Sequence, residues 1–408
     1  MRIVLINHSD SKGGASVVTY RLMKALRELG HDAQMLVTHK AMSDTNTVLV
    51  SAPFRIPFFK ECLRVFHANG LNRDDLFKVS PGLDGLPLHR HPIVKTADAV
   101  IVNWINQGMM SLRSVAAIAA EKPVLWTMHD MWNMTGICHH AGSCNAYLTG
   151  CCRCPLLHGK ASEHDLSYRI SKLKADIYAS EHIKFVAVSN WLADKARHSS
   201  LMRWCDVATI NNAFPVEEFY INPKRSRNEL GLPEGKKIIL MGAARLDDPI
   251  KGLPYAIEAL NRLQRDDVHA VFFGDMRNKN ALQELSIPHT WLGTISDALL
   301  VCELYAHASV VISTSLYETL PGTLVEGQAA GCIPVAFDSG GQTDIIDNES
   351  TGYLVEPYNT KAFATALSTA LDAVPSAEVL RQAVAHKFSS ESIAKQYINL
   401  IYSEQQRR

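Results

Sequence analysis

Short runs of apolar, often β-branched residues alternate along this chain with longer stretches whose apolar residues recur every three or four positions. The first short run, Ile3–Ile6, predicts a buried strand, and a polar loop with Gly13-Gly14 follows it. The next stretch predicts a helix that stops at Gly30. Its apolar face carries Val18, Leu22, Leu26 and Leu29. Strand, glycine pair and helix together predict the opening unit of a doubly wound α/β domain.

The same alternation continues along the rest of the chain. Further strands are predicted at Met35–Thr38, Asp98–Trp104, Pro123–Thr127, Lys184–Val188, Lys237–Met241, Val268–Phe273, Val310–Ser313 and Ile333–Phe337. Further helices are predicted at Ser162–Ala179, Trp191–Ala196 after the cap Ser189, from Pro254, from Thr323 to Gly331, and at Ala362–Leu371, Ser376–Phe388 and Ser390–Glu404. A polar, loop-like segment from Thr209 to about Lys236 predicts a linker. We therefore expect two doubly wound domains, 1–218 and 219–389.

One stretch, Ser313–Gly341, concentrates the candidate chemistry. Two carboxylates stand eight positions apart, Glu318 in a loop and Glu326 in the first turns of a helix that follows Pro321-Gly322. The free N–H groups at a helix N-terminus favour a phosphate. A neighbouring carboxylate is suited to accept hydrogen bonds from sugar hydroxyls. The combination predicts a nucleotide-sugar site, although two solvated surface acids beside a helix would leave the same pattern.

At these residues the sequence resembles retaining GT-B glycosyltransferases, in particular glycosyltransferase family 4. Glu318 and Glu326 match the family's Glu-x7-Glu motif, and the segments 316–318, 330–335 and 338–341 are also similar to it. The resemblance implies the GT-B fold, with two Rossmann-like domains facing a cleft and a C-terminal helix, here 390–408, that returns to complete the first domain. It also implies that the first domain serves the acceptor and the second binds the nucleotide sugar.

The resemblance further implies roles for individual residues. Arg245 and Lys251 match the cations that bind the donor diphosphate, with a spacing one residue longer than the commonest family form. Glu318 would orient the donor sugar and Glu326 would bind the ribose. His129 matches an active-site histidine, although a structurally satisfied histidine would also fit. The expected catalytic residues are His129, Arg245, Lys251 and Glu318. The expected donor-binding residues are Gly13, Gly14, Gly242, Arg245, Lys251, Gly274, Ile295, Glu318, Thr319, Leu320, Pro321, Gly322, Thr323, Leu324 and Glu326.

Composition narrows the function classes. The 408 residues include 41 Lys and Arg against 41 Asp and Glu, and this zero formal charge argues against nucleic acid as the main partner. No apolar run is long enough to span a bilayer. The apolar run at the start is too short for a signal-peptide core. We therefore expect a cytoplasmic protein.

Five cysteines, Cys138, Cys144, Cys151, Cys152 and Cys154, fall within seventeen residues, beside His139 and His140. The Cys151-x2-Cys154 spacing is typical of a metal knuckle. Cys138, Cys144, Cys151 and Cys154 are therefore candidate ligands of a structural zinc. Disulfides and unliganded thiols are the alternatives. A four-thiolate site leaves no open position, so a catalytic metal is not expected.

Two further segments are candidates for contact with a membrane or with the acceptor. Residues 54–73 mix aromatic and basic side chains, which predicts either a core-packed helix with snorkelling cations or weak peripheral contact with the inner face of the cytoplasmic membrane. Trp104, Asn106, Gln107 and Gly108 follow a predicted strand and are candidates for the acceptor site.

The predicted function is transfer of a sugar from a UDP- or GDP-sugar to a glycan or lipid-linked glycan acceptor in cell-surface polysaccharide biosynthesis. No Asp-x-Asp motif stands in a donor-site loop, so no catalytic cofactor is expected and the cations would replace a metal. The alternatives are a GT-B nucleotide-sugar epimerase, which would release products without an acceptor, and a non-catalytic nucleotide-sugar-binding partner subunit. The full set of Arg245, Lys251, Glu318 and Glu326 argues against the second.

Overall fold

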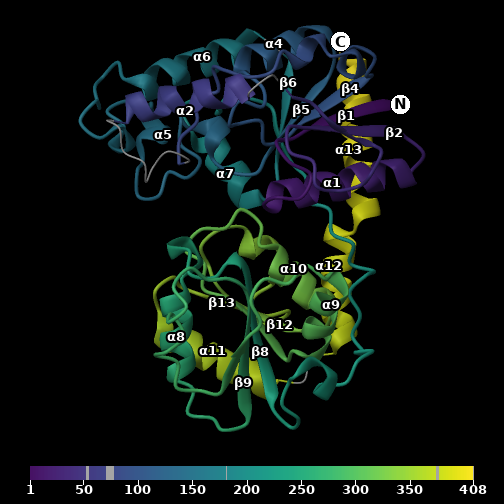
Figure 1. Ribbon diagram of the computed structural model, residues 1–408, viewed down its shortest axis with the longest axis vertical. Helices are drawn as coiled ribbons and strands as arrows, with labels where there is room; N and C mark the ends of the chain where they lie inside the picture. The colour runs from purple at the N-terminus through teal and green to yellow at the C-terminus, as the bar shows by residue number, and fades with distance from the viewer. Residues whose placement is uncertain (52–54, 70–77, 181, 374–375, 408) are drawn as a thin grey trace. The chain divides into compact units, whose positions relative to one another are not determined.

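The computed structural model describes residues 1–51, 55–69, 78–180, 182–373 and 376–407 (Figure 1). The chain divides into two compact units. Unit 1 comprises residues 1–212 and 393–408, and unit 2 comprises residues 213–392. These divisions lie within a few residues of the expected boundaries at 218/219 and 389/390.

Unit 1 is built on a parallel sheet in the order β3-β2-β1-β4-β5-β6-β7. Its strands are β1 (Arg2–Ile6), β2 (Asp32–Val37), β3 (Thr47–Leu49), β4 (Ala99–Val102), β5 (Val124–Met128), β6 (Ile183–Ala187) and β7 (Val207–Thr209). Its helices are α1 (Gly14–Glu28), α2 (Ile56–Ala68), α3 (Pro92–Lys95), α4 (Leu112–Glu121), α5 (Ala146–Thr149), α6 (Leu166–Ser180) and α7 (Asn190–His198). The strand order reverses between β1 and β4, which is where doubly wound sheets bind their ligands.

Unit 2 is built on a second parallel sheet in the order β10-β9-β8-β11-β12-β13. Its strands are β8 (Lys237–Arg245), β9 (Val268–Asp275), β10 (His289–Trp291), β11 (Val310–Ser313), β12 (Ile333–Phe337) and β13 (Tyr353–Val355). Its helices are α8 (Leu253–Asn261), α9 (Ala298–His307), α10 (Gly322–Ala329), α11 (Thr360–Asp372) and α12 (Ala377–Phe388). The α/β prediction is confirmed for both halves of the chain.

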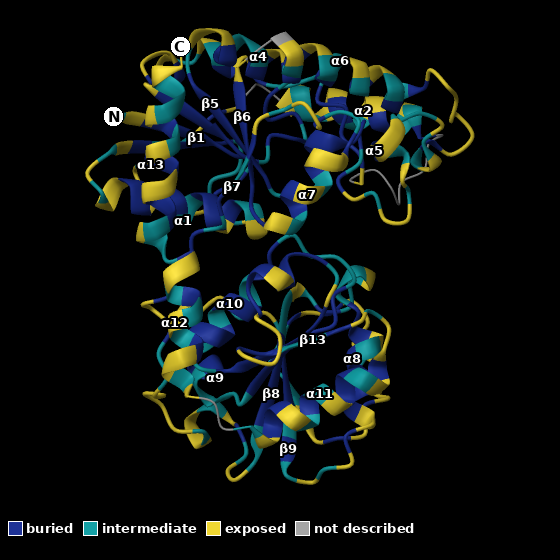
Figure 2. Cartoon of the chain, turned by 180° about the vertical axis from the view of Figure 1, so that it is seen from behind, coloured by how far each residue is buried: buried dark blue, intermediate teal, exposed yellow. Residues whose placement is uncertain are grey.

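The central strands read as continuous apolar runs because helices cover both faces of each sheet. Every residue of β5, β6, β11 and β12 is buried, and Figure 2 shows the central strands of both sheets largely in the colour of buried residues. Ser189 caps α7 as predicted, since its hydroxyl accepts a hydrogen bond from the backbone N–H of Leu192. The side chains that follow the strands are therefore held by a well-packed frame.

The last helix, α13 (Ser390–Gln406), begins in unit 2 and runs into unit 1. In unit 1 it buries Ile393, Tyr397, Ile398 and Ile401. The Tyr397 hydroxyl lies 2.9 Å from Thr127 Oγ1 of β5. This buried pair ties the helix to the sheet of unit 1.

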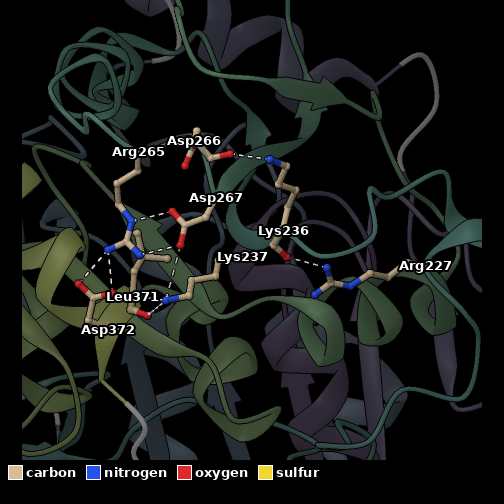
Figure 3. A network of polar contacts seen from close by, with 8 residues as sticks. All are labelled: Arg227, Lys236, Lys237, Arg265, Asp266, Asp267, Leu371 and Asp372. Carbon is tan, nitrogen blue, oxygen red and sulfur yellow. Dashed lines mark hydrogen bonds and ion pairs between the residues drawn. The ribbon is translucent and has the colours of Figure 1, made fainter.

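Charged residues close the amino ends of β8 and β9 in unit 2 (Figure 3). Arg265 forms ion pairs with Asp267 at 2.7 Å and with Asp372 at 2.8 Å, and so links β9 to α11. Beside it, Lys236 Nζ donates to the backbone oxygen of Asp266 and its own carbonyl accepts from Arg227. These charged residues stabilise the amino ends of the strands, whereas the candidate donor residues follow the carboxyl ends.

Candidate functional site

The turn after β8 delivers both predicted donor cations. β8 extends to Arg245 rather than ending at Met241, because its pairing with β9 continues to Asp275 beyond an irregularity between Gly242 and Arg245. Asp248 then caps the 3₁₀ turn Pro249–Lys251, its carboxylate accepting from the Ile250 N–H at 3.2 Å. The turn therefore fixes the position from which the Lys251 side chain leaves the backbone.

Gly252 ends this turn, and only glycine fits there. Its φ is +66°, and a Cβ would lie 2.1 Å from the backbone oxygen of Thr314. The Thr314 hydroxyl donates to the Gly252 carbonyl at 2.9 Å, and the Leu316 N–H donates to Ile250 at 2.8 Å. The β8 turn is thus bound to the loop that follows β11, although more than sixty residues separate them in sequence.

The loop after β11 holds Glu318. Its backbone oxygen accepts from the Gly341 N–H at 2.9 Å, and a Cβ on Gly340 would lie 1.9 Å from that oxygen. Ser339 Oγ donates to the Ser315 carbonyl at 2.5 Å in the same place. The glycine pair after β12 therefore allows two backbone segments to approach closely, and this contact fixes the Glu318 side chain.

These two loops bring Lys251 and Glu318 together, and Arg245 pairs with carboxylates of its own turn. Lys251 Nζ pairs with Glu318 Oε1, and their side chains are 28% and 17% exposed. Arg245 Nη2 bonds Asp248 Oδ2 at 2.6 Å, and Arg245 Nε lies 3.6 Å from Asp247 Oδ1. Two partly buried ion-paired groups therefore follow the carboxyl ends of β8 and β11, Arg245 with two aspartates and Lys251 with Glu318. Asp247 and Asp248 are the members that the sequence prediction missed, although they stand within the Arg245-to-Lys251 spacing.

The helix after the Glu318 loop carries the second carboxylate. α10 begins at Gly322, one residue earlier than predicted, and a Cβ there would lie 2.9 Å from the Phe214 ring. Thr319, Leu320, Pro321, Thr323 and Leu324 form the loop and first turn around it, with Leu320 and Leu324 buried. Glu326 lies on the next turn, close enough to α9 that burial and then its charge raise the pKa of Cys302 to about 11. Glu326 and Glu318 therefore face different neighbours.

The other predicted donor residues of unit 2 have packing roles. A Cβ on Gly242 would lie 2.0 Å from the Phe273 ring, and one on Gly274 would lie 1.8 Å from the Ala243 carbonyl. The Gly274 N–H donates to Gly293 at 2.7 Å. Ile295 lies in the partly exposed loop after β10. These glycines are accounted for by the close contact of β8 with β9, so their part in donor binding stays a prediction.

In unit 1 the loop after β1 leaves space around its glycines. Gly13 has a φ of +86°, and among the described residues no heavy atom would lie within 4 Å of a Cβ on Gly13 or Gly14. Such an open loop before the N-terminus of the fifteen-residue α1 is compatible with the predicted approach of a ligand.

His129 follows β5 at the same edge of the sheet. Its Nε2 lies 2.9 Å from Asn103 Oδ1. Burial lowers the pKa of His129 from 6.5 to about 4, against the opposing charge of Asp130. The imidazole is therefore neutral near pH 7 and can act as a hydrogen-bond partner rather than as a cation.

Beside His129 lies a buried polar chain that the sequence prediction did not find. Asp130 Oδ2 lies 2.8 Å from His139 Nδ1, and His139 Nε2 lies 3.0 Å from Ser80 Oγ. Asp130 also accepts from the Trp132 N–H at 2.8 Å and from the Trp104 indole at 3.2 Å. Burial alone would raise the pKa of Asp130, but the charge and hydrogen bond of His139 hold it below its ordinary value. The serine and histidine are almost fully buried, so the chain positions Trp104 and is not a nucleophilic triad.

The cysteine segment does not form the expected metal site. All nine cysteines of the chain are free thiols, so no disulfide is formed. Within the part of the chain that the structure describes, no group of three or more His, Cys, Asp or Glu could hold a metal ion. The predicted zinc at Cys138, Cys144, Cys151 and Cys154 is therefore not supported. The thiols are partly buried, and burial raises the pKa of Cys138 to about 11 and that of Cys154 to about 12, which keeps them protonated.

The amphipathic segment 54–73 is only partly described, since residue 54 and residues 70–73 lie outside the described ranges. Its core is α2, which buries Glu61 and Val65 but leaves Ile56, Phe59 and Leu63 46%, 61% and 68% exposed. The core-packed alternative therefore fits the face that carries Glu61 and Val65, whereas the face with Ile56, Phe59 and Leu63 is exposed. None of the helices among the described residues is both long and apolar enough to cross a membrane.

Known proteins of this architecture were compared with the chain. Sucrose-phosphate synthase from Thermosynechococcus elongatus superposes with a TM-score of 0.69 at 18% identity, covering all of both chains. Anabaena HepE in complex with UDP-glucose superposes with a TM-score of 0.67 at 16% identity, covering 99% of this chain and all of the other. Both are GT-B glycosyltransferases. The fold is GT-B.

Sequence comparison adds a family match in unit 2. Residues 223–387 match the family described as glycosyl transferases group 1. An uncharacterised glycosyltransferase of Methanocaldococcus jannaschii is 30% identical over 210 residues, which are 48% of this chain and 53% of that protein. The chain spans about half the length of this curated relative. The segment 223–387 that matches the family spans the positions of Arg245, Lys251 and Glu318.

Proposed function

We propose that the chain is a retaining glycosyltransferase of family 4, which transfers a sugar from a UDP- or GDP-sugar to a glycan or lipid-linked glycan acceptor. The observation that carries the proposal is that Arg245, Lys251 and Glu318 follow the carboxyl ends of β8 and β11, with Lys251 paired to Glu318. These residues lie inside the segment that matches the group 1 family. We assign residues 219–389 to the donor and residues 1–218 to the acceptor, with cell-surface polysaccharide as the product class.

The donor diphosphate would bind Arg245 and Lys251, whose side chains are partly exposed. Negative charge grows on the diphosphate as the bond from the sugar C1 to the phosphate oxygen breaks. Preorganised cations stabilise that charge more than they stabilise the bound donor, and this difference lowers the barrier. A metal is unnecessary in this scheme because two cations and the N-terminus of α10 supply the positive field.

The two glutamates are assigned to the remaining parts of the donor, the transferred sugar and the ribose. Glu318 lies against Lys251, next to the expected diphosphate, so its free oxygen is placed to accept hydrogen bonds from the transferred sugar. Glu326, on α10, is assigned to the ribose hydroxyls. Charge-assisted hydrogen bonds of this kind are the strong ones in sugar recognition.

We assign the retention of the anomeric configuration to attack by the acceptor hydroxyl on the same face of the sugar ring that the diphosphate leaves. The acceptor hydroxyl forms the new bond to C1 and gives its proton to the departing phosphate oxygen, so no protein nucleophile is needed. His129, neutral near pH 7, would hydrogen-bond the acceptor or the sugar from unit 1. Trp104 and the neighbouring loop are the proposed acceptor contacts.

A thermal-shift panel of nucleotides and sugar nucleotides tests the donor assignment, because a bound ligand stabilises the fold by mass action. We expect stabilisation by one nucleoside diphosphate and its sugar derivative. Proton NMR of the product formed with that donor should show the donor's anomeric configuration. An inverted product, or stabilisation by no nucleotide sugar, would refute the proposal. Epimerised sugar released without acceptor would favour an epimerase.

We also infer that α2 rests on the inner face of the cytoplasmic membrane. Ile56, Phe59 and Leu63 recur at helical spacing on one exposed face. Exposed cations flank this face, namely Arg55, Lys60 and Arg64. Apolar residues beside cations match the interface of an anionic bilayer.

Vesicle flotation separates the electrostatic contribution to this membrane contact from the apolar one. The chain should float with phosphatidylglycerol vesicles, lose binding in high salt, and bind phosphatidylcholine vesicles weakly. Phe59→Ser with Leu63→Ser should abolish flotation, whereas Val379→Ser, at a 56% exposed apolar residue on α12, should not. Flotation by neither kind of vesicle would refute the membrane assignment.

A further inference from the structure

The cations assigned to the diphosphate are already engaged by carboxylates of this chain. Arg245 is bonded to Asp248 and lies beside Asp247, and Lys251 is bonded to Glu318. A ligand anion must therefore compete with these carboxylates for the two cations. A diphosphate can bind strongly only if at least one of these carboxylates gives up its cation.

The two aspartates differ in how firmly they are held. The Asp247 side chain is 14% exposed, and its Oδ2 accepts from the Asn278 backbone N–H at 2.8 Å. Its Oδ1 and Arg245 Nε are buried atoms without a hydrogen-bond partner among the described residues, and they face each other at 3.6 Å. Asp247 is therefore a fixed counter-ion of the guanidinium, held on its other side by the Asn278 N–H.

Asp248 is held in another way. Its side chain is 38% exposed, and its two oxygens have separate tasks. Oδ1 accepts from the Ile250 N–H and caps the turn that delivers Lys251, while Oδ2 accepts from Arg245 Nη2 at 2.6 Å. The cap needs only a neutral oxygen, which asparagine and serine also supply. The bond to Arg245 is the part that needs a charge.

We propose that Asp248 is a built-in competitor for the donor diphosphate, and that Asp247 is the positioning residue that keeps Arg245 in place. This inference rests on the proposed function. Without a ligand, Asp248 occupies the Nη2 edge of the guanidinium. A phosphate oxygen takes that edge when the donor binds, and Asp248 returns to it as the nucleoside diphosphate leaves. The competition lowers affinity for donor and product alike and shortens the lifetime of the product complex.

Asp248→Asn tests the competitor because it keeps the cap and removes the charge. A hydrogen bond to a charged group contributes more free energy than a hydrogen bond between neutral groups. The difference corresponds to about tenfold in an equilibrium constant. Asp248→Asn should therefore bind the nucleoside diphosphate about tenfold more tightly and release it more slowly in stopped-flow displacement. Asp248→Ser, which also caps, should change affinity in the same direction. Asp247→Asn should weaken binding and raise the donor KM, since Arg245 loses its fixed counter-ion.

Asp275→Asn is the matched control. It removes one negative charge at the end of β9, where Asp275 is the strand partner of Arg245 but its carboxylate pairs with Lys279 at 3.9 Å. Affinity of this variant should stay within about twofold of the parent chain, because the Asp275 side chain is 57% exposed and does not occupy the Nη2 edge that the phosphate takes. A general loss of negative charge would instead tighten the control as much as Asp248→Asn.

The measurement is calorimetric titration of the full chain with UDP, GDP and inorganic pyrophosphate, with melting temperatures recorded without ligand. Tighter binding by Asp248→Asn and Asp248→Ser at unchanged melting temperature is the expected result. Equal or weaker binding by both variants, with the parent chain binding normally, would overturn this inference alone. If the parent chain bound neither nucleotide nor pyrophosphate, the proposed function would fall and this inference with it.

Discussion

Glu318→Gln separates recognition of the sugar from recognition of the diphosphate. In the structure the Glu318 carboxylate pairs with Lys251, and both side chains are partly buried. Its backbone oxygen is held independently by the Gly341 N–H, so glutamine can take the same place without moving the loop. The substitution keeps the shape and one acceptor oxygen and removes only the charge.

The expected magnitude follows from the contact that is lost. A charge-assisted hydrogen bond to a neutral sugar hydroxyl contributes about 1.5–3 kcal/mol, which corresponds to a fall in kcat/KM of about ten- to a hundredfold. Lys251, freed from its carboxylate, remains available to the phosphates. The affinity for the nucleoside diphosphate should therefore stay unchanged or rise slightly, while transfer from the full donor falls.

Calorimetry with the nucleoside diphosphate and the full sugar nucleotide is the assay, and Glu326→Gln is the comparison. Glu326→Gln should weaken both ligands alike, because the ribose is common to them. If Glu318→Gln weakened the nucleoside diphosphate as much as Glu326→Gln does, the assignment of the sugar to Glu318 and the ribose to Glu326 would be wrong.

Three further outcomes are expected. Arg245→Ala should lower turnover at saturating donor by about a hundredfold, or about 3 kcal/mol, in protein that is still folded at the assay temperature, and near-normal turnover would contradict its role. The pKa values of His8 and His129 are lowered from 6.5 to about 4, chiefly by burial, so the unfolded chain binds more protons between these values. The free energy of unfolding should fall as the pH drops from 6.5 to 4, by about 1.4 kcal/mol per pH unit for each site. His129→Gln should reduce this dependence on pH, as measured by urea unfolding at several pH values. Ser80→Ala leaves His139 Nε2 without its partner in a buried place and should cost about 1–3 kcal/mol in the same assay, whereas a loss below about 0.5 kcal/mol would show that the bond is not formed.

The fold was predictable because parallel strands buried on both faces leave a strong local signal. β5 and β12 are five-residue apolar runs, and their bounds were predicted to within one residue. The end of β8 was not predictable in this way. Its last residues, Gly242 to Arg245, have no β-branched side chain, and the strand continues there only because β9 pairs with it. That pairing is tertiary and leaves no trace in local periodicity.

In the candidate site, too, the sequence predicted the residues but not their tertiary contacts. The family motif pointed to Arg245, Lys251 and Glu318, but it gave no reason for Lys251 and Glu318 to touch, since 67 residues separate them. The contact depends on Gly252 and Gly340, two positions where backbones approach too closely for any side chain. The zinc prediction failed for a related reason. Cysteine spacing constrains which thiols can meet, but the surrounding packing determines whether four of them converge on one point.

The same reasoning explains why the Ser80, His139 and Asp130 chain escaped prediction. His139 stood next to Cys138 and was considered only as a neighbour of a metal ligand, whereas its hydrogen-bond partner lies 59 residues earlier. The backbone provides the link, because the Ser80 N–H donates to Ile137 at 2.8 Å and the Trp132 indole donates to the Ser80 carbonyl at 2.7 Å. Residues 78–80 are thus held against 137–139, and the imidazole fills the space between them. A buried imidazole needs partners at both nitrogens. Within this packing Ser80 and Asp130 supply them, and Asp130 in turn takes the indole N–H of Trp104 at the edge of the sheet where an acceptor is expected.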